Sequence, residues 1–196
     1  MRRLTLADIK DTRAYEHERD EFRRHIIELK RRRRIPLGTI MTIVFENTDT
    51  MRFQVQEMAR AERMMSDAQI EHEIETYNAL IPGAGELTAT LLIELQSESQ
   101  LREWLPKLVG IQRHIALVLA NGDEVRAVAQ DEERLTREDT TPAVHFLNFT
   151  FRPEQIEAFE HGPVQIVVDH RAYREEVELS DPQHAELLGD LRSAAG

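Results

Sequence analysis

Hydrophobic residues recur along the chain with two periods, one typical of strands and one typical of helices. The two-residue alternation of a strand marks residues 38–46, 86–95, 114–120, 124–129, 143–151 and 164–169. Helical spacing marks residues 12–34, 51–65, 67–80 and 99–109, a short segment after Pro153, and the tail from Ser180. The pattern predicts an α+β fold, with an antiparallel sheet of about six strands, helices on one side and a long N-terminal helix.

A basic run closes the predicted N-terminal helix. Residues 30–34 read Lys-Arg-Arg-Arg-Arg, and Pro36 stops the helix just beyond them. Such a run can contact the phosphates of nucleic acid, but cations are also favoured at the C-terminus of any helix. Because no aromatic interleaving or recognised nucleic-acid module accompanies the run, the sequence does not favour nucleic acid as a partner.

Length and charge bear on domain organisation. At 196 residues the chain is most economically a single domain. Within it we expect a basic N-terminal helical segment at 1–35, an α+β core at 36–179, and a C-terminal helix and tail at 180–196. Residues 1–35 hold 12 Lys and Arg against 7 Asp and Glu, whereas the remainder holds 13 against 29. The first segment is therefore basic and the rest is strongly acidic.

Composition excludes several classes of site. The chain has no cysteine, which excludes disulfides, thiolate-held iron–sulfur clusters, zinc fingers and a thiol nucleophile. A metal would take histidine, carboxylate, backbone or water ligands, as iron, manganese, magnesium and some zinc sites do. No apolar run reaches membrane-spanning length, and the N-terminus lacks the hydrophobic segment of a secretory signal. We therefore expect a cytoplasmic protein that does not associate with a membrane.

Three glutamates lie between residues 45 and 65, at positions 46, 57 and 62. Glu46 ends a predicted strand, and Glu62 falls in the middle of the apolar face of the helix predicted at 51–65. A carboxylate so placed loses its hydration on folding, so it must pair with an arginine, bind a metal or be protonated. Glu57 lies further round the same helix, where it is half covered. The alternative to a functional site is an internal Glu–Arg pair that ties this helix to the first one.

Two histidines and two neutral polar side chains complete the set of candidate site residues. Gln54 lies on the shoulder of the apolar stripe described above. His145 shares a strand face with Leu147, so its imidazole should be largely buried. A lone histidine on such a face is also typical of a hydrogen-bonded core residue. His170 and Tyr173 collect at the end of the last predicted strand, where functional groups are often found.

Several segments together resemble a known family. They are FENTDTMRFQVQEMARAER, ETYNALIPGAGELTATLLIE, AVHFLNFTF and DHRAY, and the likeness extends over nearly the whole chain, including the basic LKRRRR. The chain resembles an uncharacterised bacterial family known only as a domain of unknown function (DUF3501). The resemblance implies no established activity and no catalytic residues. It does imply genes near those of rubrerythrin-like di-iron proteins and of iron–sulfur proteins resembling heterodisulfide reductase subunits, and hence a role in redox or peroxide metabolism.

The leading hypothesis is a carboxylate and histidine metal site that binds iron or another transition metal. Its ligands would be Glu46, Glu57, Glu62, His145 and His170, with Gln54 or Tyr173 hydrogen-bonded behind them. The Glu-x-x-His pairs of ferritin-like di-iron bundles are absent, so the ligands would have to come from separate elements. Whether the chain catalyses a reaction is left open by this pattern.

Two alternatives stand beside the metal site. The opposite charges of the first segment and the remainder favour a non-catalytic module that docks on a redox protein or forms a homo-oligomer. The arginines and His170 could instead form an anion-binding pocket for a small phosphorylated or carboxylated ligand. A hydrolase is not favoured, because neither a Gly-x-Ser-x-Gly turn nor a phosphate-binding glycine loop occurs.

Overall fold

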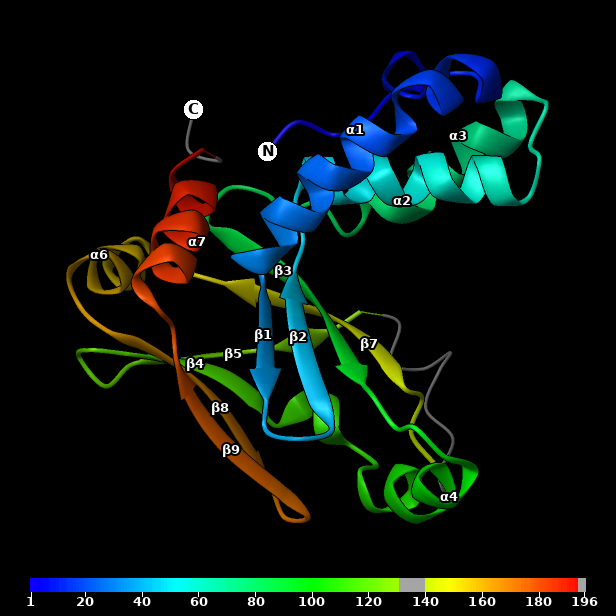
Figure 1. Cartoon of the computed structure of the whole chain (residues 1–196). Coiled ribbons are helices and arrows are strands. Elements are labelled where there is room, and N and C mark those ends of the chain that lie inside the picture. Colours follow the sequence, from blue (N-terminus) through cyan, green and yellow to red (C-terminus); the bar gives the residue numbers. More distant parts are fainter. Residues whose placement is uncertain (131–139, 194–196) are drawn as a thin grey trace.

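The computed structural model describes residues 1–130 and 140–193, and two antiparallel sheets form its centre (Figure 1). The five-stranded sheet has the order β1 (Arg34–Leu37), β2 (Met41–Phe45), β3 (Glu86–Ile93), β7 (Val144–Thr150) and β6 (Val128–Ala129). The four-stranded sheet has the order β5 (Glu124–Arg126), β4 (Ile115–Leu119), β8 (Val164–His170) and β9 (Tyr173–Glu178). Neighbouring strands are antiparallel throughout both sheets.

The predicted α+β class with antiparallel strands is confirmed, but the strands divide between two sheets instead of forming one. The inner faces of both sheets share one continuous hydrophobic core, to which Phe45 and Leu117 belong. Because each sheet turns one face towards this core, both produce the same alternation in sequence, although β2 is buried on both of its faces. Two strands escaped prediction: β1 begins at the last residue of the basic run and contains Pro36, and β9 is rich in charged residues.

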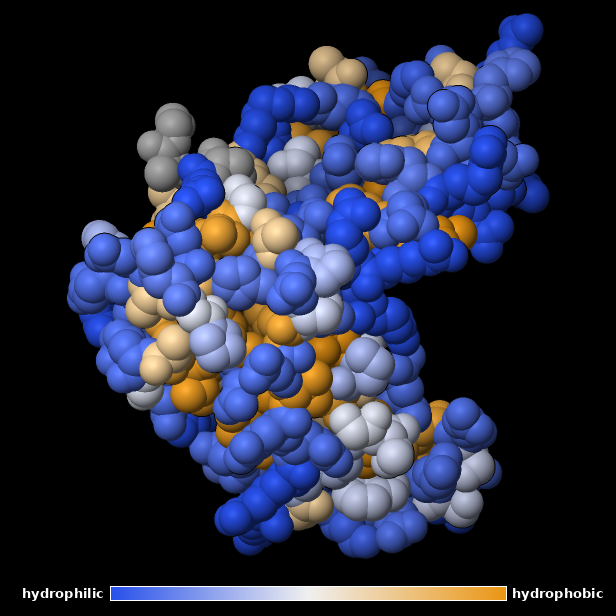
Figure 2. Space-filling view, turned by 60° about the vertical axis from the view of Figure 1, so that its left-hand side comes forward, coloured by the Kyte–Doolittle hydropathy of each residue, from blue (hydrophilic) through white to orange (hydrophobic). Residues whose placement is uncertain are grey.

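A helical lobe projects from the sheets at one corner of the molecule (Figure 1). It consists of η1 (Leu6–Asp8), α1 (Thr12–Arg31), α2 (Thr48–Ala61) and α3 (Asp67–Asn78). Its own apolar cluster is separate from the core between the sheets and contains Leu4, Met51, Val55, Ile74, Leu80 and Ile81. Figure 2 shows the surface hollowed where this lobe overhangs the rest of the molecule. Among the described residues, the structure contains no helix that is both long and apolar enough to cross a membrane.

The remaining helices cover other parts of the sheets (Figure 1). They are α4 (Glu98–Lys107), the short η2 (Ile111–Arg113), α6 (Pro153–His161) and α7 (Asp181–Ser193). Helix α7 lies beside the junction of α1 and β1, whereas α4 lies at the opposite end of the molecule. The helices therefore lie at both ends of the sheets, with the lobe and α7 at the end where β2 leads into α2.

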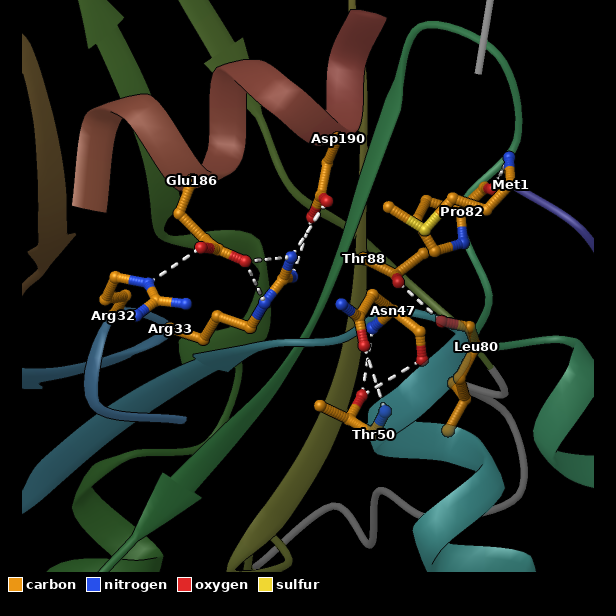
Figure 3. A network of polar contacts seen from close by, with 10 residues as sticks. All are labelled: Met1, Arg32, Arg33, Asn47, Thr50, Leu80, Pro82, Thr88, Glu186 and Asp190. Atoms are coloured by element: carbon orange, nitrogen blue, oxygen red, sulfur yellow. Dashed lines mark hydrogen bonds and ion pairs between the residues drawn. The ribbon is translucent and has the colours of Figure 1, made fainter. Parts of the chain in front are cut away.

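Buried ion pairs join α7 to the basic run (Figure 3). The side chain of Arg33 is only 1% exposed, and its two terminal nitrogens donate to Asp190 at 2.7 and 2.8 Å. Arg33 also contacts Glu186 at 2.8 Å, and Arg32 contacts the second oxygen of Glu186 at 2.8 Å. Although burial tends to raise the pKa of Glu186, the hydrogen bond from Arg32 and the charge of Arg33 outweigh it and lower that pKa.

The other arginines of the run are paired as well. Arg31 pairs with Glu28 on the same helix, and Arg34 pairs with Glu94. The positive charge of Arg31–Arg34 is therefore balanced by carboxylates of the same chain. This leaves less of it for the phosphates that such a run could contact.

Candidate functional site

A cavity of about 250 Å³ lies between the helical lobe and the outer face of the five-stranded sheet. Strands β1, β2, β3 and β7 form its floor, and the ends of α1, α2 and α3 contribute to its walls. The lining residues are Lys30, Arg34, Val44, Glu46, Met51, Gln54, Tyr77, Leu80, Thr90, Leu92, Val144 and Phe146. We call this cavity the Glu46 pocket, since Glu46 is the one carboxylate among the described residues that line it.

The pleat of the sheet decides which side chains face the pocket. Val44 pairs with Arg34 on one side and with Thr90 on the other, and Thr90 pairs in turn with Phe146. These four residues form one row across four strands, and their side chains lie on the outer face. Successive residues of a strand point to opposite faces. Glu46 therefore points outward like Val44, whereas Phe45 between them is buried in the core between the sheets.

Hydrogen bonds fix the backbone around Glu46. The amide of Glu46 donates to the Thr88 carbonyl at 2.8 Å, which continues the ladder one step beyond β2. Asn47 then caps α2, because its side chain accepts from the Thr50 amide at 2.9 Å while the Thr50 hydroxyl accepts from the Asn47 amide (Figure 3). The Thr88 hydroxyl donates to the carbonyl of Leu80, which holds the end of α3 against the sheet. Glu46 is thus placed by three elements at once.

One oxygen of the Glu46 carboxylate has no hydrogen-bond partner among the described residues. The side chain is only 5% exposed. Its Oε1 accepts from the Thr90 hydroxyl at 2.7 Å, but its Oε2, which is also buried, accepts no hydrogen bond from any described residue. A buried carboxylate oxygen left in this state loses its hydration without compensation, which is costly to the fold.

Four further polar side chains line the same pocket. The Gln54 amide approaches the Tyr77 hydroxyl at 3.5 Å, the outer limit of a hydrogen bond, so both groups can turn to another partner. Lys30 is half-buried at the end of α1, and within the described parts of the chain its ammonium makes no ion pair or hydrogen bond. Arg34 differs, because its charge is balanced by Glu94. A hydrogen bond from Thr42, joined by the one from Arg34, lowers the pKa of Glu94.

Glu57 lies outside this pocket and holds two helices together. Arg19 of α1 donates to both of its oxygens at 2.8 Å, and the buried Tyr15 hydroxyl donates to it at 2.7 Å. The hydrogen bond from Arg19, more than any other contact, lowers the pKa of Glu57 to about 2. The Glu–Arg pair that the sequence offered as the alternative to a metal ligand therefore exists, and Glu57 supplies it.

The prediction that Glu62 lies buried on an apolar helix face is wrong. Helix α2 ends at Ala61, Glu62 caps it, and the side chain of Glu62 is exposed. Arg63 then adopts a left-handed conformation with φ of 53°, and Met65 is 88% exposed. The expectation failed because the helical periodicity was extended to Met65, beyond the point where the chain turns.

The two candidate histidines lie in the interior, away from Glu46. His145 is only 5% exposed, as expected, and its Nε2 lies 3.0 Å from the Thr141 hydroxyl. It lies on the inner face of β7, whereas Glu46 lies on the outer face of the same sheet. His170, in the other sheet, is 3% exposed; its Nε2 contacts the Val109 carbonyl at 3.3 Å and its Nδ1 accepts from the Ala172 amide at 3.2 Å.

His170 is held as a neutral imidazole. A carbonyl can only accept and an amide can only donate, so Nε2 carries the proton and Nδ1 is the acceptor. Burial is the main cause that lowers the pKa of His170. With both ring nitrogens engaged, His170 offers no free donor to an anion and no free lone pair to a metal in this conformation.

Tyr173 joins the two sheets through backbone contacts. Its hydroxyl donates to the Leu37 carbonyl at 2.7 Å and accepts from the Thr39 amide at 3.1 Å, so it holds the turn between β1 and β2. Gly38 occupies this turn with φ of 70°, and a side chain there would come within 2.3 Å of the Tyr173 hydroxyl. Tyr173 is therefore engaged in holding the fold, apart from the Glu46 pocket.

Of the seven candidate residues, the structure thus brings only Glu46 and Gln54 to the pocket, while His170 and Tyr173 pair with each other across β8 and β9. Within residues 1–130 and 140–193, no group of three or more His, Cys, Asp or Glu side chains is arranged to hold a metal ion. Sequence reasoning missed Lys30 and Tyr77. Tyr77 falls within the helical spacing predicted at 67–80, where it is an ordinary helix residue, and Lys30 is one member of the basic run. Only the fold shows that the four arginines of this run pair with carboxylates, whereas Lys30 lines the pocket.

Comparisons with known proteins give the family but no activity. The chain is 31% identical to a protein from Burkholderia pseudomallei K96243 whose crystal structure is described as that of a novel protein of unknown function. The two structures superpose with a TM-score of 0.90, covering 97% of this chain and 100% of the other. No curated protein gives a significant match. The family described as Protein of unknown function (DUF3501) matches residues 3–191, and the chain therefore belongs to this family.

Proposed function

We propose that this protein binds a small molecule in the Glu46 pocket, and that the ligand brings a hydrogen-bond donor to Glu46 Oε2. The observation that carries the proposal is the buried carboxylate oxygen that accepts no hydrogen bond from the described residues. The neighbours of Glu46 on the outer face, Val44 and Thr90, show that apolar and neutral side chains fit this surface. A glutamate at this position therefore serves something other than packing.

Energetics support a ligand at this position. A buried ionised group without full hydrogen bonding destabilises the folded state. A ligand that binds only the folded protein and satisfies that group recovers the loss and stabilises the protein by mass action. The glutamate at position 46 then lowers the stability of the ligand-free protein but favours binding, and such a trade-off is common at functional sites.

Size and lining limit the ligand. The volume of about 250 Å³ is slightly below the roughly 300–1,000 Å³ of pockets for drug-sized molecules, so the ligand is small. Apolar side chains form one part of the wall and polar or charged side chains the other, with Met51, Leu92 and Phe146 among the first group and Lys30, Glu46 and Gln54 among the second. Sites for small molecules combine apolar side chains with converging polar groups in this way. Gln54 and Tyr77 are placed to orient the bound molecule.

The iron or other transition-metal site and the redox role gain no support from this geometry. Of the five expected ligands, only Glu46 lines the pocket, whereas such metals take several histidine or carboxylate ligands. Both stay predictions, as does docking on a redox partner or self-association. Elemental analysis of protein purified without added metal or chelator tests the metal, and near-stoichiometric iron, manganese or zinc would favour it.

The test of the proposal is a thermal-shift screen with small amines, alcohols, acids and amino acids. A compound counts as a ligand if it raises the melting temperature of the wild type but not that of Glu46→Gln. Glu62→Gln is the matched control, because it makes the same chemical change at an exposed glutamate outside the pocket. We expect ligands to stabilise the control as they do the wild type. A screen in which each stabilising compound acts equally on Glu46→Gln would contradict the proposal.

A further inference from the structure

A carboxylate and an ammonium, two groups of opposite charge, line the same small cavity. Glu46 presents an oxygen without a hydrogen-bond donor, and Lys30 presents an ammonium that pairs with no described residue. We propose that the ligand of the Glu46 pocket is a small zwitterion, with an ammonium that binds Glu46 and a carboxylate or other anionic group that binds Lys30. This inference rests on the proposed function, because it names the chemical class of the same ligand.

Lys30 stands apart from the rest of the basic run. Arg31 pairs with Glu28, Arg32 and Arg33 pair with Glu186, and Arg34 pairs with Glu94. Lys30 alone faces the pocket without such a partner in the described structure. A lysine ammonium is a compact charge on a flexible stem with three donors, so it can follow an anionic group over a range of ligand lengths.

The charge balance of the pocket favours a zwitterion over a singly charged ligand. Arg34 is neutralised by Glu94 at the edge of the cavity, so Glu46 and Lys30 leave the interior close to neutral. A simple amine would satisfy Glu46 and leave Lys30 without a partner, and a simple acid would do the reverse. A molecule with both charges forms two charge-assisted hydrogen bonds, which are stronger than neutral ones. Its apolar middle meets Met51, Leu92 and Phe146.

A homologous series of ω-amino acids tests the inference and measures the span between the two charges. Binding of β-alanine, 4-aminobutanoate, 5-aminopentanoate and 6-aminohexanoate to the full chain is measured by calorimetry. Butylamine and butanoate are the singly charged controls. We expect at least one amino acid to bind ten-fold or more tightly than both controls, with an optimum at one chain length.

Two variants assign each charge to its residue. Lys30→Met should remove the advantage of the amino acid over butylamine, and Glu46→Gln should remove its advantage over butanoate. Lys10→Met is the matched control, because Lys10 pairs with Glu18 outside the pocket and should leave affinity unchanged. Circular dichroism confirms that each variant is folded, and Lys30→Gln replaces Lys30→Met if it is not.

The outcomes separate this inference from the proposed function. If butylamine binds as tightly as the best amino acid and Lys30→Met changes nothing, the ligand is a simple amine. The zwitterion is then overturned, while binding at Glu46 stands. If no member of the series binds, the zwitterion is again overturned, and the screen with Glu46→Gln decides separately whether the pocket takes another ligand.

Discussion

Glu57 and Glu62 belong to one stretch of chain but have opposite environments. Glu57 is bridged to Arg19 and Tyr15, whereas Glu62 stands in solvent at the end of α2. Their residue types and approximate helical positions were visible in the sequence. What was not visible was the helix end at Ala61, and therefore which carboxylate would be desolvated. At the scale of single residues, the sequence supplied candidates, and the tertiary partners decided their roles.

Glu57→Gln should destabilise the protein in a pH-dependent way. The folded pKa of Glu57 is about 2, below its ordinary value of 4.5, so its ion pair stabilises the fold above about pH 4.5 and loses this effect as the pH falls towards 2. Allowing for solvent screening, we expect a loss of about 1–2 kcal/mol at pH 7, measured by urea denaturation. Glu62→Gln should leave stability unchanged, and equal losses in both variants would contradict these assignments.

Tyr173→Phe should destabilise the protein without affecting the pocket. The substitution removes the hydroxyl that contacts the backbone of Leu37 and Thr39, and leaving buried backbone groups unpaired costs about 1–3 kcal/mol. Tyr77→Phe is the comparison, because the hydroxyl of Tyr77 makes only a long contact with Gln54. Urea denaturation should show a clear loss for Tyr173→Phe and little change for Tyr77→Phe. A larger loss of stability for Tyr77→Phe than for Tyr173→Phe would show that the Tyr173 hydroxyl does not hold the fold.

At the scale of elements, periodicity located most helices and strands but not their grouping. Strand β7 spans Val144–Thr150, close to the predicted 143–151, and α3 spans Asp67–Asn78, close to the predicted 67–80. Strand β9 was missed because charged residues alternate on its exposed face. The pairing of strands into two sheets could not be predicted, because register and partner choice depend on contacts between distant segments.

Arg33→Met should loosen the attachment of α7 far more than Arg32→Met. Arg33 is buried between Glu186 and Asp190, and its loss leaves two carboxylates facing an apolar side chain. Removing one partner of such a buried network typically costs about 3–5 kcal/mol, whereas Arg32 is partly exposed and its loss should cost under about 1 kcal/mol. Urea denaturation measures the change in unfolding free energy of each variant, and hydrogen exchange shows which element has lost stability. Slow exchange retained in α7 of Arg33→Met would contradict this role.

At the scale of the whole molecule, the pocket arises where a helical lobe meets the outer face of a sheet. Only the assembled fold brings Lys30 of α1, Glu46 after β2 and Tyr77 of α3 to one cavity. Sequence analysis identified Glu46 because a carboxylate at a strand end is conspicuous. It could not foresee that the pleat sets Glu46 and His145 on opposite faces of one sheet, since their strands are not adjacent and the strand order was unknown. This separates His145 from Glu46, and His170 is separated from both because it lies in the other sheet.

The central claim is that Glu46 serves a ligand at the expense of the fold, and one measurement tests it most directly. The unfolding free energy of Glu46→Gln is compared with that of the wild type, both ligand-free, by urea denaturation at pH 7. Glutamine keeps an oxygen for the Thr90 hydroxyl and removes the unpaired buried charge. We expect a variant that is as stable as the wild type or more stable by up to about 2 kcal/mol. A loss of more than about 1 kcal/mol, typical of a broken hydrogen-bond network, would show that Glu46 is structural and contradict the claim.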